Sequence, residues 1–214
     1  LVSPDTDLSP DCGKTSASPQ TFVTGKAAER AGAALRRMLL RLANAGEGAR
    51  LELEGHRLIV REQAVLREVD LSALPRDAFG YVQCAEESFD PPTSPLDENG
   101  QGKPYAVYGY GAHLAMVEVD TRLGTVKPLR IVAAHDVGRA INPILVEGQI
   151  EGGVAQGIGM ALMEEFIPGR GENLHDYLIP TIGDVPPIES ILVERASSVG
   201  PFGAKGIGEQ ALIP

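Results

Sequence analysis

The sequence has no long apolar run and no recognisable targeting segment. None of its hydrophobic stretches approaches the ~20 residues that a helix needs to span a bilayer. The start of the chain also lacks the charged and apolar regions of a secretory signal peptide. We therefore expect no membrane association.

Cysteine is scarce as well. Cys12 and Cys84 are the only two, and they are too far apart in the sequence to form a CxxC pair. This usage gives no metal site and suggests reduced thiols in a cytoplasmic protein.

Basic residues are outnumbered by acidic ones. The chain has 19 Lys and Arg against 29 Asp and Glu, which gives a formal net charge of −10 at pH 7. This balance argues against a dedicated nucleic-acid surface, because the phosphate backbone attracts basic patches. We expect no nucleic-acid partner.

What is present is typical of an ordinary globular protein. The 214 residues are 43% hydrophobic, enough to bury a core in one or two domains. The chain begins at Leu1 rather than at methionine, and it stops in the apolar run 211–214 directly after a glycine-rich loop. We interpret it as a piece of something larger: a fragment, a processed chain or one chain of a split subunit.

The first residues predict a loop followed by a helix. Residues 1–20 are rich in Ser, Pro, Asp and Thr, which favours irregular structure. Apolar residues then recur at helical spacing over 26–44, with the arginines on a solvated face. Gly46 and Gly48 are expected to end this helix.

A small hairpin should come next. Apolar and polar residues alternate over 51–60 around a turn at 54–55. Asp70 or Ser72 is placed to cap a brief helix that runs toward Phe79.

The second half begins after a proline-rich stretch. Residues 90–104 carry four prolines and two glycines, so they predict a long loop or linker. Strand patterns over 106–120 and 126–134 predict a hairpin, and a helix should occupy 144–166. We expect an α+β fold of mixed and antiparallel sheets packed with helices, divided into subdomains 1–95 and 96–214.

The helix expected over 144–166 is unusually rich in glycine. Each glycine costs roughly 1 kcal/mol relative to alanine in a helix. Close packing against another element is therefore predicted. A dinucleotide fingerprint is a poor alternative, because the order of the glycines is wrong. The five are Gly148, Gly152, Gly153, Gly157 and Gly159.

The most informative motif is GPFGAKGIGEQ, residues 200–210. Its four glycines allow backbone amides to approach an anion without obstruction by a Cβ atom. Glu209, directly after them, is placed to act as a general base beside whatever the loop holds. Taken alone, a glutamate beside glycines is more often a surface residue. A phosphate-binding loop is excluded, because Gly206 stands where Ser or Thr should bind magnesium.

Two further polar features leave alternatives open. Gln149, among the helix glycines, bonds either a cofactor or a nearby backbone group. His135 and Asp136 end a predicted strand, and without a third ligand we interpret them as a structural hydrogen-bonded pair rather than metal ligands. The other histidines receive no role.

Four segments of the second half then change the interpretation. Their order and approximate spacing strongly resemble the C-terminal part of the molybdenum-binding subunit of the xanthine dehydrogenase/aldehyde oxidoreductase family, the molybdenum hydroxylases. A weaker fifth segment, SASPQTFVTGKAA (16–28), is similar to the family's cofactor-contacting loop and following helix. The four are HDVGRAINP (135–143), GQIEGGVAQGIG (148–159), DYLIPTIGDVP (176–186) and GPFGAKGIGE (200–209).

The resemblance implies roles for particular residues. Glu209 matches the family's catalytic glutamate beside the metal, and Gln149 matches a glutamine that bonds the pterin. The backbone of Ala17 corresponds to the point where the chain approaches the molybdenum. The remaining residues implied to contact or line the pterin site are Ser16, Ser18, Gln20, Gly206, Ile207 and Gly208, together with Ala17.

The chain departs from the family pattern in two ways. Pro19 stands where many bacterial members have an arginine, which weakens the implied phosphate contact. The upstream GGGFG-type and MGQG-type loops are absent, as are the residues that usually grip the substrate. The resemblance therefore covers half of an active site, and the upstream part of the molybdenum subunit is an expected partner.

The implied activity is oxidative hydroxylation with water as the oxygen source, with Glu209 as the base. The cofactor would be molybdopterin in its mono- or dinucleotide form, with [2Fe-2S] clusters and FAD on partner domains or subunits. We favour an aromatic nitrogen heterocycle, purine- or nicotinate-like, as the small-molecule substrate. Aldehydes, carbon monoxide and thioester-linked aromatics stay open, as does a non-catalytic assembly subunit. An independent nucleotide-binding module is the least favoured alternative.

Overall fold

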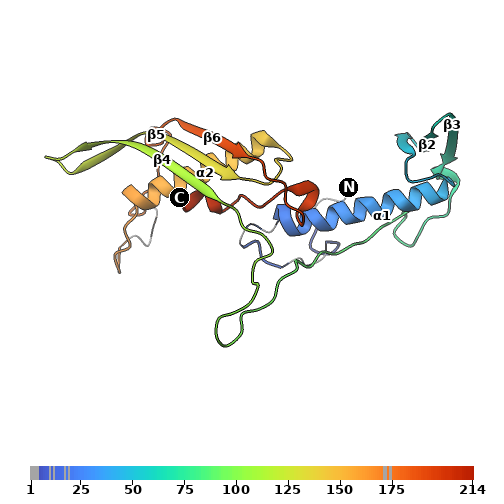
Figure 1. Cartoon of the computed structure of the whole chain (residues 1–214), viewed down its shortest axis with the longest axis horizontal. Coiled ribbons are helices and arrows are strands. Elements are labelled where there is room, and N and C mark those ends of the chain that lie inside the picture. The colour runs from blue at the N-terminus through green and yellow to red at the C-terminus, as the bar shows by residue number, and fades with distance from the viewer. Residues whose placement is uncertain are drawn as a thin grey trace. The chain divides into compact units, whose positions relative to one another are not determined.

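The chain divides into two compact units, shown in Figure 1. We call Leu1–Thr24 with Pro91–Pro214 the terminal unit, and Gly25–Asp90 the inserted unit. The predicted subdomains 1–95 and 96–214 are a different division and stay a prediction. The computed structural model describes residues 5–9, 11, 13–16, 18, 20–170, 173 and 175–214.

The inserted unit is one helix with a small antiparallel sheet. Helix α1 spans Gly25–Leu42, and the sheet has the order β1 (Arg50–Glu54), β2 (Arg57–Glu62), β3 (Val65–Asp70). The predicted helix and hairpin are confirmed, whereas β3 was not predicted. It follows a turn at Gln63, which adopts a positive φ of 52° without the glycine that usually marks such a turn. The buried core of the unit consists of Leu40, Ala43, Ala49, Leu58 and Val60.

Helix α1 ends at Leu42 and is closed by Asn44, two residues later, rather than by the expected glycines. Asn44 has a φ of 49°, and its N–H donates to Arg41 O at 3.0 Å. The N–H of Ala45 donates to Leu40 O at 2.9 Å, which completes a Schellman motif. The prediction that Gly46 and Gly48 end the helix was therefore wrong by two residues.

The brief helix after β3 is shorter than predicted. A single 3-10 turn covers Leu71–Ala73, and it does not reach Phe79. The predicted cap is present, since Asp70 Oδ1 accepts the N–H of Ser72 at 2.9 Å.

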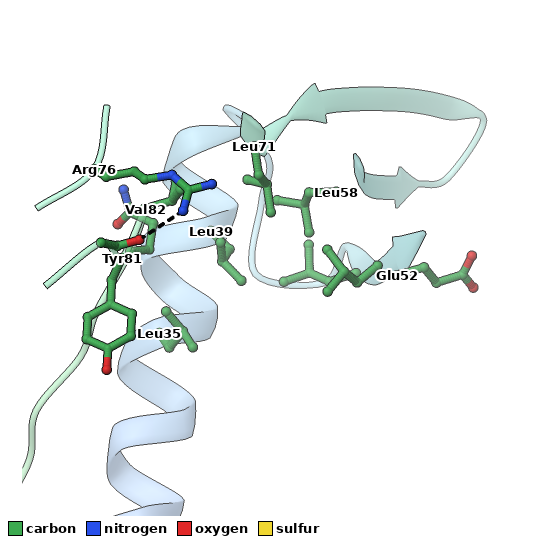
Figure 2. A pocket seen from close by; sticks show the side chains of 12 residues that line it. Leu35, Leu39, Glu52, Leu58, Leu71, Arg76, Tyr81 and Val82 are labelled. Atoms are coloured by element: carbon green, nitrogen blue, oxygen red, sulfur yellow. Dashed lines mark hydrogen bonds between the residues drawn. The ribbon is translucent and has the colours of Figure 1, made fainter. Parts of the chain in front are cut away.

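An apolar cavity of about 430 Å³ lies within the inserted unit. Figure 2 shows Leu35 and Leu39 of α1 facing Leu58 of β2 across it, with Tyr81 on the segment that passes beside the helix. None of the residues predicted to bind the cofactor lines this cavity. It therefore belongs to the packing of this unit and not to the predicted site.

The terminal unit contains a mixed three-stranded sheet. Strands β4 (Gly111–Asp120) and β5 (Thr125–Asp136) form the predicted antiparallel hairpin, and β6 (Ile188–Val193) pairs with β5 in parallel. Asp120 closes the turn by accepting the N–H of Arg122 and of Leu123 through Oδ1. Strand β6 was missed, because a parallel pairing between distant segments leaves no local turn signal. With α1, α2 and both sheets, the α+β class is confirmed.

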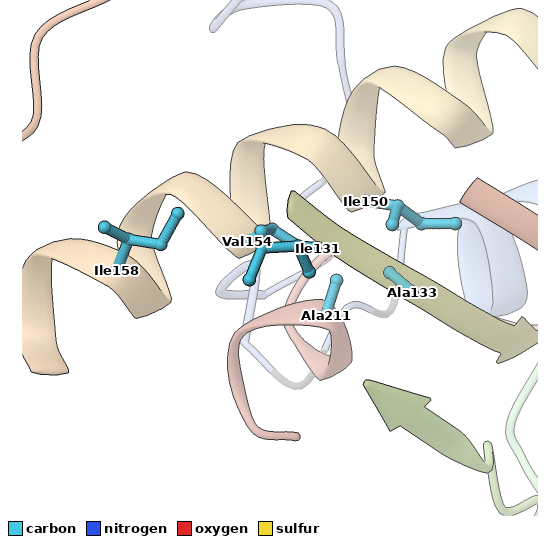
Figure 3. Packing of buried hydrophobic residues seen from close by; sticks show 6 residues of the cluster. All are labelled: Ile131, Ala133, Ile150, Val154, Ile158 and Ala211. Carbon is cyan, nitrogen blue, oxygen red and sulfur yellow. The ribbon is translucent and has the colours of Figure 1, made fainter. Parts of the chain in front are cut away.

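Helix α2 spans Pro143–Leu162 and packs on β5. Asn142 caps its start by accepting the N–H of Leu145 at 3.2 Å, and Pro143 occupies the first turn, where its missing N–H is not needed. Figure 3 shows the contact between the helix, the strand and the short C-terminal 3-10 turn Gln210–Leu212. The buried residues of this core are Ile131, Ala133, Ile150, Val154, Ile158 and Ala211.

The glycines of α2 fall into two groups. A Cβ at Gly153 would lie 2.7 Å from Ala211 Cβ, and one at Gly159 would lie 2.8 Å from a proline ring. The close packing predicted for the helix is confirmed at these positions. At Gly148 and Gly152, by contrast, no described atom apart from the neighbouring residues and the backbone of the helix itself lies within 4 Å of the Cβ position, so packing against other elements does not explain them.

The length of α2 also differs from the prediction. The helix ends at Leu162, four residues before the predicted end at 166. Within the described residues, no helix is both long and apolar enough to cross a membrane.

Candidate functional site

The glycine-rich loop after β6 is bound to the segment that follows β5. Arg139 N–H donates to Gly203 O at 2.9 Å, and Lys205 N–H donates to Val137 O at 3.0 Å. Gly138 lies between these bonds with a φ of 68°, and a Cβ there would collide with Gly203 O. Only glycine satisfies both the positive φ and this close approach. The HDVG and GPFGAKG motifs are therefore two sides of one structure.

Three segments distant in sequence converge at the end of this loop. A Cβ at Gly206 would lie 2.7 Å from Ser18 O. A Cβ at Gly208 would lie 3.2 Å from Ser18 Oγ and 3.6 Å from Gln149 Oε1. Ser18 Oγ–H donates to Glu209 Oε2 at 3.4 Å. The structure thus brings together five of the residues that the sequence pointed to.

A cavity of about 480 Å³ opens beside this point. Ser16, Ser18, Lys205 and Glu209 supply polar groups to its wall, and Tyr105 is among the aromatic residues that line the rest. Such a lining, apolar with a few polar groups, is typical of a site that binds a small molecule.

The other predicted residues lie differently. Gln20 is engaged by near neighbours, donating to Thr15 Oγ1 at 2.7 Å and accepting from Thr24 Oγ1 at 3.0 Å. Ile207 packs against the hydrophobic core of the terminal unit rather than lining the cavity. Ala17, with its predicted approach to the molybdenum, lies outside the described residues, as do Pro19 and Cys12.

A nearly buried ion pair joins the glycine-rich loop to the end of β5. Lys205 Nζ lies 2.6 Å from Asp136 Oδ2, with the two side chains 11% and 12% exposed. The same ammonium donates to Tyr108 O at 2.9 Å. Burial alone would raise the pKa of Asp136, but the hydrogen bonds from Lys205 and from the Gly138 amide outweigh it and hold that pKa below its usual value.

Two histidines form a second contact at this end of the sheet, one from β4 and one from β5. His135 is fully buried, and its Nε2 lies 2.7 Å from His113 Nε2. Burial lowers the pKa of both rings, and the mutual repulsion of the two lowers that of His135 further. Neighbouring on β5, His135 and Asp136 bond different partners rather than each other.

No role was predicted for His113 from the sequence, and Lys205 was considered only as part of a phosphate-binding loop, an interpretation that was excluded. The partners of both come from strands or loops far away in the chain, so no local spacing identifies them. Among the described residues, no group of three or more His, Cys, Asp or Glu is placed to hold a metal ion.

The donor set at the convergence point fits a pterin better than a bare metal. The amide of Gln149 both donates and accepts, as does the hydroxyl of Ser18, which suits the mixed nitrogen and oxygen edge of a pterin ring. The glycine faces of 206 and 208 allow close approach. The described residues here do not form a metal site of their own, so a metal ion would be bound by the cofactor rather than by the protein.

Comparison with known sequences shows the family to which the chain belongs. The chain matches the family model of the molybdopterin cofactor-binding domain over residues 1–186. It is 31% identical over 224 residues to the xanthine dehydrogenase molybdenum-binding subunit of Escherichia coli O157:H7, covering 98% of this chain and 28% of that one. It is 33% identical over 225 residues to the 6-hydroxypseudooxynicotine dehydrogenase complex subunit gamma of Paenarthrobacter nicotinovorans, covering 100% and 27%. The chain thus spans little more than a quarter of the length of these relatives.

The fold is also similar to that of solved structures. The aldehyde oxidoreductase from Desulfovibrio desulfuricans ATCC 27774 superposes with a TM-score of 0.74 at 30% identity, covering 97% of this chain and 20% of that one. The aldehyde oxidoreductase from Desulfovibrio gigas gives a TM-score of 0.69 at 26% identity, covering 98% and 21%.

Proposed function

Since the chain belongs to the molybdopterin cofactor-binding domains of the xanthine dehydrogenase/aldehyde oxidoreductase family, we propose that it forms one wall of the active site of a molybdenum hydroxylase. The observation that carries this proposal is the convergence of Ser18, Gln149 and Glu209 on a glycine-lined face. The opposite wall would come from the upstream part of the molybdenum subunit.

The residues at this face would hold the cofactor from one side. Gln149 would hydrogen-bond the pterin, and Ser16 and Ser18 would contact the pterin and its phosphate. Gly206 and Gly208 would let the backbone come close. When bound, the molybdenum cofactor supplies the two-electron oxidation of the substrate carbon, with water as the oxygen source.

Glu209 is suited to accept a proton at this face. Its Oε2 accepts a hydrogen bond from the hydroxyl of Ser18, and this bond orients the carboxylate. A correctly placed base of this kind contributes ~10²–10⁴ in rate. Glu209 also argues against a purely structural assembly role, which would not require a carboxylate there.

We propose an aromatic nitrogen heterocycle, purine- or nicotinate-like, as the substrate. The similarity to the xanthine dehydrogenase and 6-hydroxypseudooxynicotine dehydrogenase subunits supports this class. The alternative is an aldehyde, favoured by the similarity to the aldehyde oxidoreductase structures. Electrons would leave through [2Fe-2S] clusters and FAD on partner domains or subunits, in a cytoplasmic hetero-oligomer.

The test is to purify the assembled enzyme and measure molybdenum, pterin and turnover together. The panel is hypoxanthine, nicotinate, benzaldehyde and carbon monoxide. We expect molybdenum near one per complex and hydroxylation of hypoxanthine or nicotinate. Turnover of benzaldehyde or carbon monoxide alone would overturn the heterocycle assignment, and absence of molybdenum would overturn the function.

A further inference from the structure

Two adjacent residues at the end of β5 hold the two ends of the segment 206–209. Asp136 Oδ2 accepts from Lys205 Nζ at 2.6 Å, immediately before the segment. His135 Nδ1 lies 3.4 Å from Gln210 Nε2, immediately after it. Side chains of neighbouring strand residues point to opposite faces, so one strand end reaches the segment from two sides.

The chemistry of the glutamine contact fixes the direction of its hydrogen bonds. An amide nitrogen only donates, so His135 must accept at Nδ1. The proton of the neutral ring is then on Nε2, from which it is donated to His113 Nε2 at 2.7 Å. Both ring nitrogens of His135 therefore take part in hydrogen bonds.

Packing leaves the two side chains little freedom to move. His135 is fully buried, and a Cβ at Gly111 would lie 2.7 Å from its ring. A Cβ at Gly109 would collide with Oε1 of Gln210. The glycines at both places therefore let the strand-end residue and the glutamine fit together closely.

We propose that His135 and Asp136 are positioning residues that clamp the segment 206–209 and thereby hold the Glu209 carboxylate against Ser18. This inference rests on the proposed role of Glu209. His135 acts only through Gln210, and Asp136 only through the ammonium that precedes the segment. A displacement of about 1 Å in a reacting group can cost ~10²-fold in rate. Holding the segment 206–209 in place therefore keeps the Glu209 carboxylate in the position in which it can accept a proton.

Two conservative substitutions open the clamp from either end in the assembled enzyme. Asp136→Asn keeps an oxygen that accepts the N–H of Gly138 but removes the charge that holds Lys205. Gln210→Met keeps the length of the side chain but removes the donor to the histidine. The matched control is Glu189→Gln, which removes the exposed ion pair with a β5 arginine elsewhere on the same sheet.

The first measurement is hydrogen–deuterium exchange of the backbone amides of 205–212, which needs no turnover. We expect exchange in this segment to accelerate by about 10-fold in Asp136→Asn and in Gln210→Met, with the rest of the sheet unchanged. Glu189→Gln should leave the segment as in the wild type. Unchanged exchange in both clamp variants would overturn the proposal.

The second measurement separates positioning from cofactor retention. With the panel substrate that the wild type turns over fastest, kcat should fall by about 10- to 100-fold while KM and molybdenum content stay within about 2-fold. A loss of kcat that only follows a loss of molybdenum would overturn the positioning role. If Glu209→Gln retained full activity, the proposed function would fail, whereas the clamp would still be judged by the exchange rates.

Discussion

A single added methyl group should distinguish the two kinds of glycine in α2. Gly153→Ala places a Cβ 2.7 Å from Ala211 Cβ, 3.0 Å from the carbonyl carbon of Ala211 and 3.2 Å from Leu212 N. Two of these three neighbours are backbone atoms, which cannot move aside as a flexible side chain can. Gly152→Ala, one residue earlier, meets no described atom within 4 Å apart from the neighbouring residues and the backbone of α2 itself.

The expected sizes follow from two opposing effects. Alanine gains about 1 kcal/mol over glycine in a helix interior. Overpacking a filled contact costs about 1–3 kcal/mol, and the backbone contacts at Gly153 favour the upper part of that range. The net result is a destabilisation of about 1–2 kcal/mol for Gly153→Ala, or roughly 2–8 °C in Tm, against a stabilisation of up to about 1 kcal/mol for Gly152→Ala.

The assay is urea and thermal unfolding of the metal-free protein, compared at one pH and one protein concentration. The expected pattern is a lower midpoint for Gly153→Ala and an equal or higher one for Gly152→Ala. Equal stabilisation by both substitutions would refute the account of how α2 packs on the C-terminal turn. Equal destabilisation would show that something also covers Gly152.

Three further predictions concern the site and its supports. Gln149→Ala should lower the molybdenum content of the assembled enzyme, measured by mass spectrometry; a fully loaded variant would contradict its role. Gly206→Ala should also reduce loading, because its Cβ would lie 2.7 Å from Ser18 O and force the two segments apart; normal loading would count against the convergence. Burial lowers the pKa of His113 and His135, so the unfolded chain takes up protons first as the pH falls. The free energy of unfolding should therefore decrease below about pH 6.5, the ordinary value for histidine, and urea titrations from pH 8 to 5.5 with no such decrease would be evidence against the neutral pair.

The parts of the fold with local signals were predictable from sequence. The helix at 26–44 and the hairpin that turns at Gly124 have the right type and nearly the right bounds, because amphipathic spacing and turn residues act over a few positions. Strand β6 and the non-glycine turn at Gln63 gave no such signal. The ends of both helices were misplaced, since a helix end depends on the conformation of single residues such as Asn44, whose positive φ closes α1 without a glycine.

The candidate site was predictable only through motifs. Glu209 and Gln149 were identified by their resemblance to a family, and the structure brings both of them to the same place as Ser18. Gln20 and Ile207 came from the same motifs, yet their side chains are engaged elsewhere. A motif locates a segment near a ligand but does not say which side chains of that segment face it.

The supports of the site could not be predicted, because they are pairwise contacts between distant segments. The Asp136–Lys205 ion pair joins residues 69 positions apart, and His135 and His113 meet across a hairpin. Such contacts emerge only when the strands have paired in a definite register.

The substitution Glu209→Gln in the assembled enzyme tests the central claim most directly. The amide keeps the size of the side chain and can still accept the hydroxyl of Ser18, but it cannot take up a proton. Molybdenum and pterin content should stay at the wild-type level while kcat on the panel substrate falls by about 10²–10⁴. Near-normal turnover with a full complement of molybdenum would contradict the account.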